Sequence, residues 1–364
     1  MENMEPHKNS ATRTPLNSVV QRRSKSRSYR QSYRSCLGAA SRLCFTPAMT
    51  SRRLNTIRKA PKLNNIVDKV DAQQLALLMK TEWQLSCVTP LHHFRYTQLK
   101  SYARQLSEYM TAEKQQGLAV GVEGALSFRV TFSVVQGMAQ TDVDAETVLI
   151  QIFSKPLFAR KDEPAIMNEV WKGWLTCING SSDYINSLPK DFTCLPLFGS
   201  SGLAALTALV KSWFQRNFDC CFAPSDISHT SLQWLVALWT NCHTESDIQQ
   251  LKMIWTLPVV PLLQVTYSVS PVDAWHLWCS VRRDSQEMEE QDSIVIDEVM
   301  GLMKGLMCHF YRHFRVDLSA GSLTSVSTSL GTAKGSGKIK FSNSKCMTTM
   351  LTLLTECAFL RMPI

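Results

Sequence analysis

The stretch DFTCLPLFGSSGLAALTALVKSWFQRNFDCCFAP, residues 191–224, decides how the rest of the chain is interpreted. A short apolar strand ends at Pro196, and because proline lacks an N–H we expect this strand at a sheet edge or a strand end. Gly199 to Gly202 supply a turn and a helix N-cap. The helix that follows has apolar residues at helical spacing, namely Leu203, Leu206, Val210, Trp213 and Phe214. The stretch therefore predicts a core anchor, in which each buried ring contributes about 1.5–3 kcal/mol.

Charge is distributed unevenly along the 364 residues. The first 62 residues hold 14 Lys and Arg against two acids, whereas the remainder holds 25 against 28. The +9 net charge thus belongs to an N-terminal tail, and the body is mildly acidic. Residues 1–66 contain too few large apolar side chains to offset chain entropy, so we expect a disordered basic tail.

Three interpretations of this tail stay open. The QRRSKSR run, with Arg22, Arg23, Lys25 and Arg27, is typical of a nuclear-localisation or nucleic-acid-contacting segment. A mitochondrial presequence would fit the Arg/Ser bias, although Glu2, Glu5 and the length of the tail count against it, and a merely solvated tail is the third possibility. Two Thr-Pro dipeptides are candidate sites for proline-directed kinases, at Thr14 and Thr46.

The composition of the chain bears on its environment. Twelve cysteines, without an apolar leader or any C-x-x-C pair, predict a reducing compartment and no zinc ribbon. The longest apolar run, residues 203–210, is too short to cross a membrane. Nine Trp and fifteen Met either fill two cores or supply apolar surface that is shared with a partner.

Hydrophobic periodicity predicts an α+β fold. Helices are expected from Asp71 to Pro90, over 99–117, over 203–217 and 230–242, from 271, over 293–313 and over 346–360. Strands are expected at 118–122, 128–134, 148–153, 170–178, 253–257, 263–269, 315–319, 323–329 and 339–342. Helix-then-sheet occurs at least twice, which favours two mostly antiparallel lobes, 67–190 and 191–364.

Candidate chemistry is sparse. GTAKGSGK, residues 331–338, lacks P-loop spacing and is followed by a strand, so a lysine-bearing hairpin tip is favoured over a phosphate loop. Cys308, His309 and His313 could bind a metal or form a thiol–imidazole pair, but no Glu lies between the histidines and Arg312 adjoins them. Asp191 and Asp219 flank the anchor helix, with basic neighbours in sequence. We expect no enzyme, no cofactor, no metal site and no small-molecule substrate.

Several separate blocks together resemble the centromere protein L family of the vertebrate inner kinetochore. They are TPLHHFRYTQLKSY (89–102), EKQQGLAV (113–120), DFTCLPLF (191–198), WFQRNFDCCFAP (213–224), CHFYRHF (308–314) and VSTSLGTAKGSGKIK (326–340). Their common order makes the resemblance far more specific than any one motif. It extends from about residue 71 to the C-terminus and excludes the tail, the acidic loop and the segment near residues 160–167.

The resemblance implies a non-enzymatic scaffold with curved sheets, located in the nucleus at the centromere and kinetochore. It implies a heterodimer with centromere protein N through the C-terminal sheet and helix, within the network that contains centromere proteins C, H, I, K and M and rests on nucleosomes with the centromeric histone H3 variant. We therefore expect residues 318–364 to offer an exposed strand and a last helix to that partner. The alternative is a sequence-nonspecific DNA-binding module, whose phosphate contacts would be Arg312, Arg315, Lys334, Lys338 and Lys340.

Overall fold

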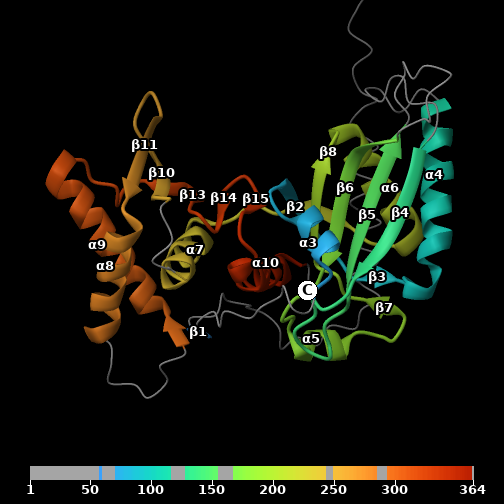
Figure 1. The fold of residues 1–364 in the computed structure, drawn as a ribbon, viewed down its shortest axis with the longest axis horizontal. Helices are drawn as coiled ribbons and strands as arrows, with labels where there is room; N and C mark the ends of the chain where they lie inside the picture. The colour runs from blue at the N-terminus through green and yellow to red at the C-terminus, as the bar shows by residue number, and fades with distance from the viewer. Residues whose placement is uncertain are drawn as a thin grey trace, which may run out of the picture. The chain divides into compact units, whose positions relative to one another are not determined.

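The computed structural model describes residues 57–59, 70–115, 128–154, 167–242, 249–284 and 293–362 (Figure 1). Its helices are α3 (Ala72–Leu78), α4 (Leu99–Gln115), α5 (Ser182–Ser187), α6 (Ala204–Phe218), α7 (His229–Asn241), α8 (Pro271–Asp284), α9 (Ile296–Phe314) and α10 (Met347–Arg361). Its short strands are β1 (Ile57–Lys59), β3 (Leu91–His92), β7 (Phe192–Thr193), β9 (Phe222–Pro224) and β12 (Ser293–Val295). The longer strands are β2 (Glu82–Val88), β4 (Phe128–Val135), β5 (Thr147–Ser154), β6 (Asn168–Thr176), β8 (Leu197–Gly202), β10 (Leu251–Leu257), β11 (Leu263–Val269), β13 (Ser322–Ser327), β14 (Gly331–Lys334) and β15 (Lys338–Phe341).

One antiparallel sheet contains all ten longer strands. Their order is β11-β10-β13-β14-β15-β2-β8-β6-β5-β4, and β9 pairs with the far end of β2. Every ladder in it is antiparallel, which confirms the α+β class and the mostly antiparallel sheet. Two small ribbons, β1–β12 and β3–β7, lie outside it.

Helices cover opposite faces of the two halves of this sheet. Successive residues of a strand point to opposite faces, and in β8 Leu197 belongs to one hydrophobic cluster while Phe198 belongs to the other. The first cluster joins β2, β10 and β13–β15 to α7, α9 and α10; the second joins β4–β6 to α4 and α6 (Figure 1). Both clusters draw on residues either side of position 190, so the division into 67–190 and 191–364 stays a prediction.

The anchor stretch differs from its prediction at the Gly/Ser turn. Residues 197–202, predicted as a turn and an N-cap, form β8, an interior strand between β2 and β6. The strand predicted before Pro196 is β7, which pairs with β3 alone within the described residues. Gly199 is needed because a Cβ there would lie 2.3 Å from the indole of Trp174 on the neighbouring strand. The helix is confirmed as α6, with Leu206, Val210, Trp213 and Phe214 buried.

Three other predicted elements are corrected. The helix from Asp71 ends at Leu78, and Lys80 adopts a left-handed φ of 59°, so residues 82–88 form a strand and not the rest of a helix. Residues 331–334, expected in a loop, form β14, whereas residues 315–319 form no strand. The predicted strand at 118–122, its turn, the cap at Gly117, the acidic loop and the tail to residue 56 lie outside the described residues.

The tryptophans fill the core. Eight of the nine are buried, namely Trp83, Trp171, Trp174, Trp213, Trp234, Trp239, Trp255 and Trp278. Trp275 is half-buried and packs against the first cluster. Of the two uses considered for these residues, the structure therefore supports core filling, and surface for a partner has to come from other side chains.

Candidate interaction surfaces

The first candidate surface is the open edge of the sheet at β11. Within the described residues β11 pairs with β10 alone, in register from Leu257↔Leu263 to Leu251↔Val269. No charged residue occurs between Lys252 and Asp273, so the edge lacks the charges that normally prevent strand addition. At the opposite end of the sheet, β4 carries the exposed Arg129 and follows residues that the structure does not describe. Of the two ends, β11 therefore has the properties of a strand-pairing site.

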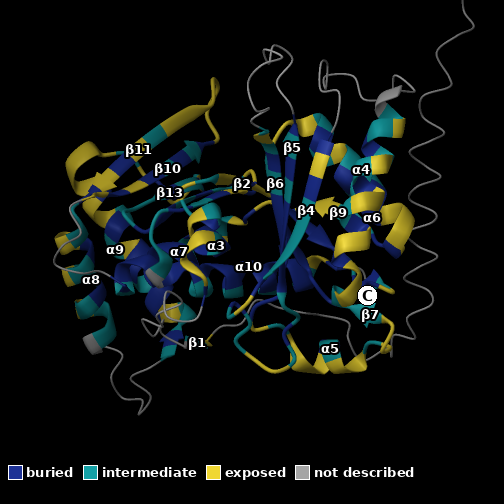
Figure 2. Ribbon diagram, turned by 45° about the vertical axis from the view of Figure 1, so that its right-hand side comes forward, coloured by how far each residue is buried: buried dark blue, intermediate teal, exposed yellow. Residues whose placement is uncertain are grey.

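The hairpin between β10 and β11 extends this edge with apolar side chains. Val259, Val260, Leu262 and Leu263 are all exposed, with Leu262 at 73% (Figure 2). Large apolar side chains gathered at one loop tip are unfavourable in water, and burial against another surface would stabilise them. The tip and the β11 edge together make one continuous partner-binding candidate, which we call the β11 edge.

Residues 318–364 do not offer the exposed strand that was expected of them. Strands β13, β14 and β15 each have a neighbour on both sides. Helix α10 already buries most of its apolar side chains, among them Met350, Leu354 and Phe359. The expectation is wrong because β2, which comes from far earlier in the chain, pairs with β15 and closes the sheet there.

The second candidate surface is the sheet face opposite the first cluster. Along β14 and β15 the side chains alternate, with Ala333, Ile339 and Phe341 buried beneath. Lys334 lies directly across from Lys338, and Lys340 is on the same face two residues further along. Lys252 on β10 belongs to this face too, because it pairs with Ser327, which pairs with Thr332 opposite Lys340. These four residues define the lysine face.

Glu82 on β2 partly neutralises the lysine face. Lys334 Nζ donates to Glu82 Oε2 at 3.1 Å, and Lys338 Nζ lies 3.3 Å from Glu82 Oε1. The hydrogen bond from Lys334, helped by Lys338, lowers the pKa of the Glu82 carboxyl. All three side chains are 40–47% exposed, so this group holds its charges at the surface, where an added anion could compete for the lysines.

Arg312 and Arg315 lie apart from those lysines. They belong to the last turn and the C-cap of α9, a helix whose buried side chains join the first cluster beneath the sheet. Near them the Tyr267 hydroxyl bonds His309 Nδ1 at 2.7 Å, and burial raises the pKa of Tyr267 to about 12. The five predicted DNA contacts thus form two groups. Three lysines lie on the exposed face of the sheet, and two arginines lie at the C-terminal end of α9, on the side of the sheet that the helices cover.

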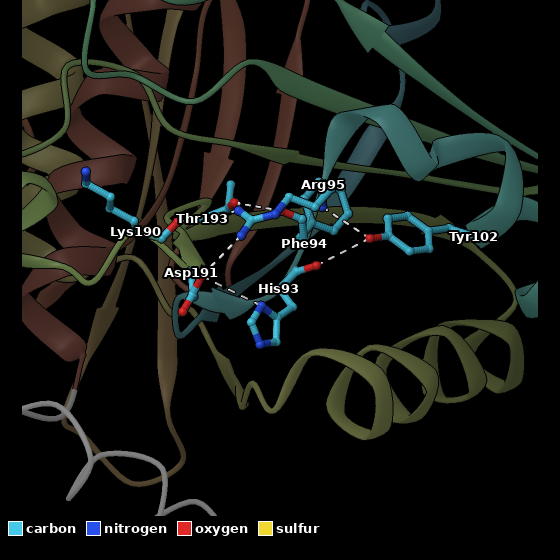
Figure 3. A network of polar contacts seen from close by, with 7 residues as sticks. All are labelled: His93, Phe94, Arg95, Tyr102, Lys190, Asp191 and Thr193. Atoms are coloured by element: carbon cyan, nitrogen blue, oxygen red, sulfur yellow. Dashed lines mark hydrogen bonds and ion pairs between the residues drawn. The ribbon is translucent and has the colours of Figure 1, made fainter.

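The remaining candidates for chemistry have structural partners. Gly331–Phe341 forms the β14–β15 hairpin, which confirms the lysine-bearing hairpin and not a phosphate loop. Asp191 pairs with Arg95 at 3.3 Å and lies 3.9 Å from His93 Nδ1, beside the β3–β7 ribbon (Figure 3). In the same network the Arg95 amide donates to the Tyr102 hydroxyl and Thr193 to the Phe94 carbonyl, so these groups fasten β3 to β7 and α4.

Cys308, His309 and His313 share the exposed C-terminal half of α9. The rings of His309 and His313 are 4.6 Å apart, and His309 is occupied by Tyr267. Among the described residues no three His, Cys, Asp or Glu side chains are grouped as they would be to hold a metal ion. No helix of the described part is long and apolar enough to cross a membrane. Arg22, Arg23, Lys25, Arg27, Thr14 and Thr46 lie outside that part.

Comparison with known proteins decides the family. A family profile described as Centromere protein L matches residues 77–359, which include both candidate surfaces. The chain belongs to the centromere protein L family. Centromere protein L of Danio rerio is 52% identical over 97% of this chain and 94% of its own length. The proteins of that name from Homo sapiens and Xenopus tropicalis are each 38% identical over 83% of this chain and cover 85% and 84% of their own lengths.

The family match confirms the resemblance predicted from the sequence blocks. Membership of the centromere protein L family supports a role as a centromere protein. The β11 edge could not be found from those blocks, since none of them includes residues 251–269. The signal that the sequence did contain was the absence of charge from residue 253 to residue 272.

Proposed function

We propose that this centromere protein L family member is a non-enzymatic structural subunit of the inner kinetochore that forms a heterodimer with centromere protein N through the β11 edge. The observation that carries the proposal is an uncharged strand, β11, that has one neighbouring strand among the described residues and is continued by an exposed apolar hairpin tip. Such an edge has a row of unpaired N–H and C=O groups, which a strand of a partner satisfies by β-augmentation.

The two parts of the β11 edge have different tasks. Main-chain hydrogen bonds along Leu263–Val269 supply binding free energy without regard to sequence, whereas the apolar tip supplies specificity by filling a pocket of the partner. The inward side chains Tyr267 and Val269 are buried, which fixes the register of β11 before a partner arrives. A preformed edge of this kind lowers the ordering cost of association.

The wider assembly follows the family. We propose that the heterodimer joins centromere proteins C, H, I, K and M on nucleosomes that contain the centromeric histone H3 variant, and so anchors kinetochores for chromosome segregation. The chain would act in the nucleus, on the chromosome at the centromere. Arg22, Arg23, Lys25 and Arg27 would serve nuclear import, and phosphorylation at Thr14 and Thr46 is proposed on sequence alone.

Binding of purified centromere protein N to variants of the full-length chain tests this proposal. Leu262→Glu with Leu263→Glu places two charges on the tip, and Thr266→Lys puts a blocking charge on an exposed position of β11. We expect each change to weaken binding at least tenfold. Leu203→Glu, at an exposed apolar residue remote from β11 in the fold, is the matched control and should bind normally. A one-to-one complex of unchanged affinity with all variants would overturn the proposal.

A second candidate function is sequence-nonspecific DNA contact by the lysine face. Lys252, Lys334, Lys338 and Lys340 share a surface that no helix of the described part covers, and their charges suit phosphates but not base edges. Glu82 offsets part of this charge, and so DNA contact is proposed as secondary to protein association.

A further inference from the structure

Helix α9 has two apolar faces: the inner face is buried in the core, and the outer face is mostly exposed in the described part of the chain, with Met307 half-buried against the first cluster. The inner face packs into the first cluster through Val299, Leu302, Met303, Leu306 and Phe310. The outer face carries Met300, Tyr311 and Phe314, which are 59%, 47% and 61% exposed. All three are among the exposed large apolar side chains of the described part of the chain. The outer face is therefore unusually apolar for a helix surface that contacts solvent.

The spacing of the outer face points to a helical partner. Met300, Lys304, Met307, Tyr311 and Phe314 follow one another at intervals of four, three, four and three residues. This 3.5-residue average is the spacing of a coiled-coil seam, whereas a partner strand would need no such period. We call these five residues the outer stripe; at 1.5 Å per residue it is about 21 Å long, enough for a partner helix of four turns.

The charges around the outer stripe point to an acidic partner. Lys304 lies within it, and the Arg315 guanidinium lies 5.9 Å from the Tyr311 ring centre. Neither Lys304 nor Arg315 forms an ion pair with a described residue. The acids of α9 are confined to its first turn, where Glu298 is buried and lies 3.4 Å from Arg282.

We propose that the outer stripe binds an amphipathic helix of another protein subunit, with apolar residues at coiled-coil spacing and Asp or Glu beside them. The apolar residues would cover Met300, Met307, Tyr311 and Phe314, and the acids would meet Lys304 and Arg315. DNA is a poor fit, because DNA phosphates are contacted by cationic and polar side chains and the outer stripe is mostly apolar. The stripe adjoins β11, because Tyr267 of β11 bonds His309 and packs on Phe310, which contacts Phe314. It differs from the β11 edge in kind, since it suits a helix and not an added strand, and so it implies a second protein contact beyond strand pairing.

Site-directed photocrosslinking identifies the occupant. The full-length chain with Tyr311→p-benzoylphenylalanine is assembled with the inner-kinetochore subunits named above and irradiated, and the cross-linked peptides are mapped by mass spectrometry. We expect a cross-link to a helix of another subunit with apolar residues three and four apart and acids beside them. The same probe at Leu203, which is also exposed, is the control and should not capture that helix.

Charge reversal gives an independent readout. Lys304→Glu with Arg315→Glu should lower the cross-linking yield from position 311 at least tenfold, while binding through the β11 edge stays unchanged. The proposal is overturned by a cross-link to a second copy of this chain, to DNA, or to a strand or loop, and equally by no cross-link in the complete assembly. Because β11-edge binding is measured separately, failure of this inference is distinguishable from failure of the proposed heterodimer.

Discussion

The indole of Trp174 lies directly over Gly199 in the centre of the sheet, so close that a Cβ on that glycine would be 2.3 Å from two ring carbons. The ring is 2% exposed and packs edge-on against Trp83, with ring centres 5.8 Å apart. This contact joins β8, β6 and β2, the strands shared by the two helix layers.

Gly199→Ala should therefore destabilise the whole body of the protein. The added methyl forces Trp174 off its rotamer, and overpacking of this kind costs about 1–3 kcal/mol of unfolding free energy. Urea unfolding followed by tryptophan fluorescence measures the loss. Gly335→Ala is the matched control, since a Cβ there would meet its first neighbour at 3.4 Å. Equal stability of the two variants would contradict the packing described for Trp174.

DNA binding by the lysine face should respond in opposite directions to two changes. Glu82→Gln removes the anion that holds Lys334 and Lys338 and should tighten binding by about 1 kcal/mol, roughly fivefold. Lys334→Glu with Lys338→Glu should weaken binding and reduce the slope of log K against log salt by about 2. Fluorescence anisotropy with two unrelated duplexes tests both, and Lys100→Glu on the exposed face of α4 is the control. If Glu82→Gln weakened binding, the lysine face would not be the site.

Stability should fall in mild acid because of His229. Its Nδ1 accepts a hydrogen bond from the Leu323 amide at 2.8 Å, and burial lowers the pKa of this imidazole below its ordinary 6.5. The unfolded chain then binds the proton first, so stability is complete above about pH 6.5 and is lost as the pH falls through the pKa of the folded state. The slope cannot exceed about 1.4 kcal/mol per pH unit for one group.

The variant His229→Asn isolates this effect. Asparagine keeps an acceptor near the Leu323 amide but cannot be protonated, so the difference in unfolding free energy between wild type and variant should shrink as the pH falls from 7.5 to 5.5. Chemical denaturation at each pH measures it. A difference independent of pH would show that His229 does not titrate with unfolding.

Arg58 should hold the β1 strand to the folded body of the protein. Arg58 is 9% exposed in its side chain, pairs with Glu356 at 2.6 Å, and lies over the Trp234 ring at 4.9 Å. Arg58→Met removes both this largely buried ion pair and the contact with the Trp234 ring, so it should cost about 3 kcal/mol. Thermal unfolding compares it with Arg104→Met on exposed α4, which should change little. A normal melting temperature for Arg58→Met would mean that β1 is not held in solution.

Local patterns predicted the helices better than they predicted the sheet. The stripes of α4, α6, α7 and α8 are periodic in the sequence, and each was found within a few residues. Residues 199–202 were interpreted as a turn because Gly and Ser dominate them, but the reason for Gly199 is the Trp174 ring of a neighbouring strand. Such a reason exists only in tertiary structure.

The candidate surfaces show the same division. A lysine-bearing hairpin was predicted from sequence, although β14 was assigned to its loop, whereas Glu82, the partner of these lysines, is 252 residues from Lys334 and was placed on a helix. β11 was recognised as a strand, yet its position at the end of the sheet depends on strand order, which the sequence does not contain. The expectation of an exposed strand in residues 318–364 was wrong for that reason.

Amide hydrogen exchange on the β11 edge tests the central claim most directly. The full-length chain is measured alone and with centromere protein N, and the peptides that cover Leu263–Val269 are compared with those of β14 and β15, which are paired on both sides in the free chain. We predict that alternate β11 amides, unpaired before binding, gain at least tenfold protection in the complex while β14 and β15 stay unchanged. A stable complex in which β11 exchanges as fast as in the free chain would contradict the account.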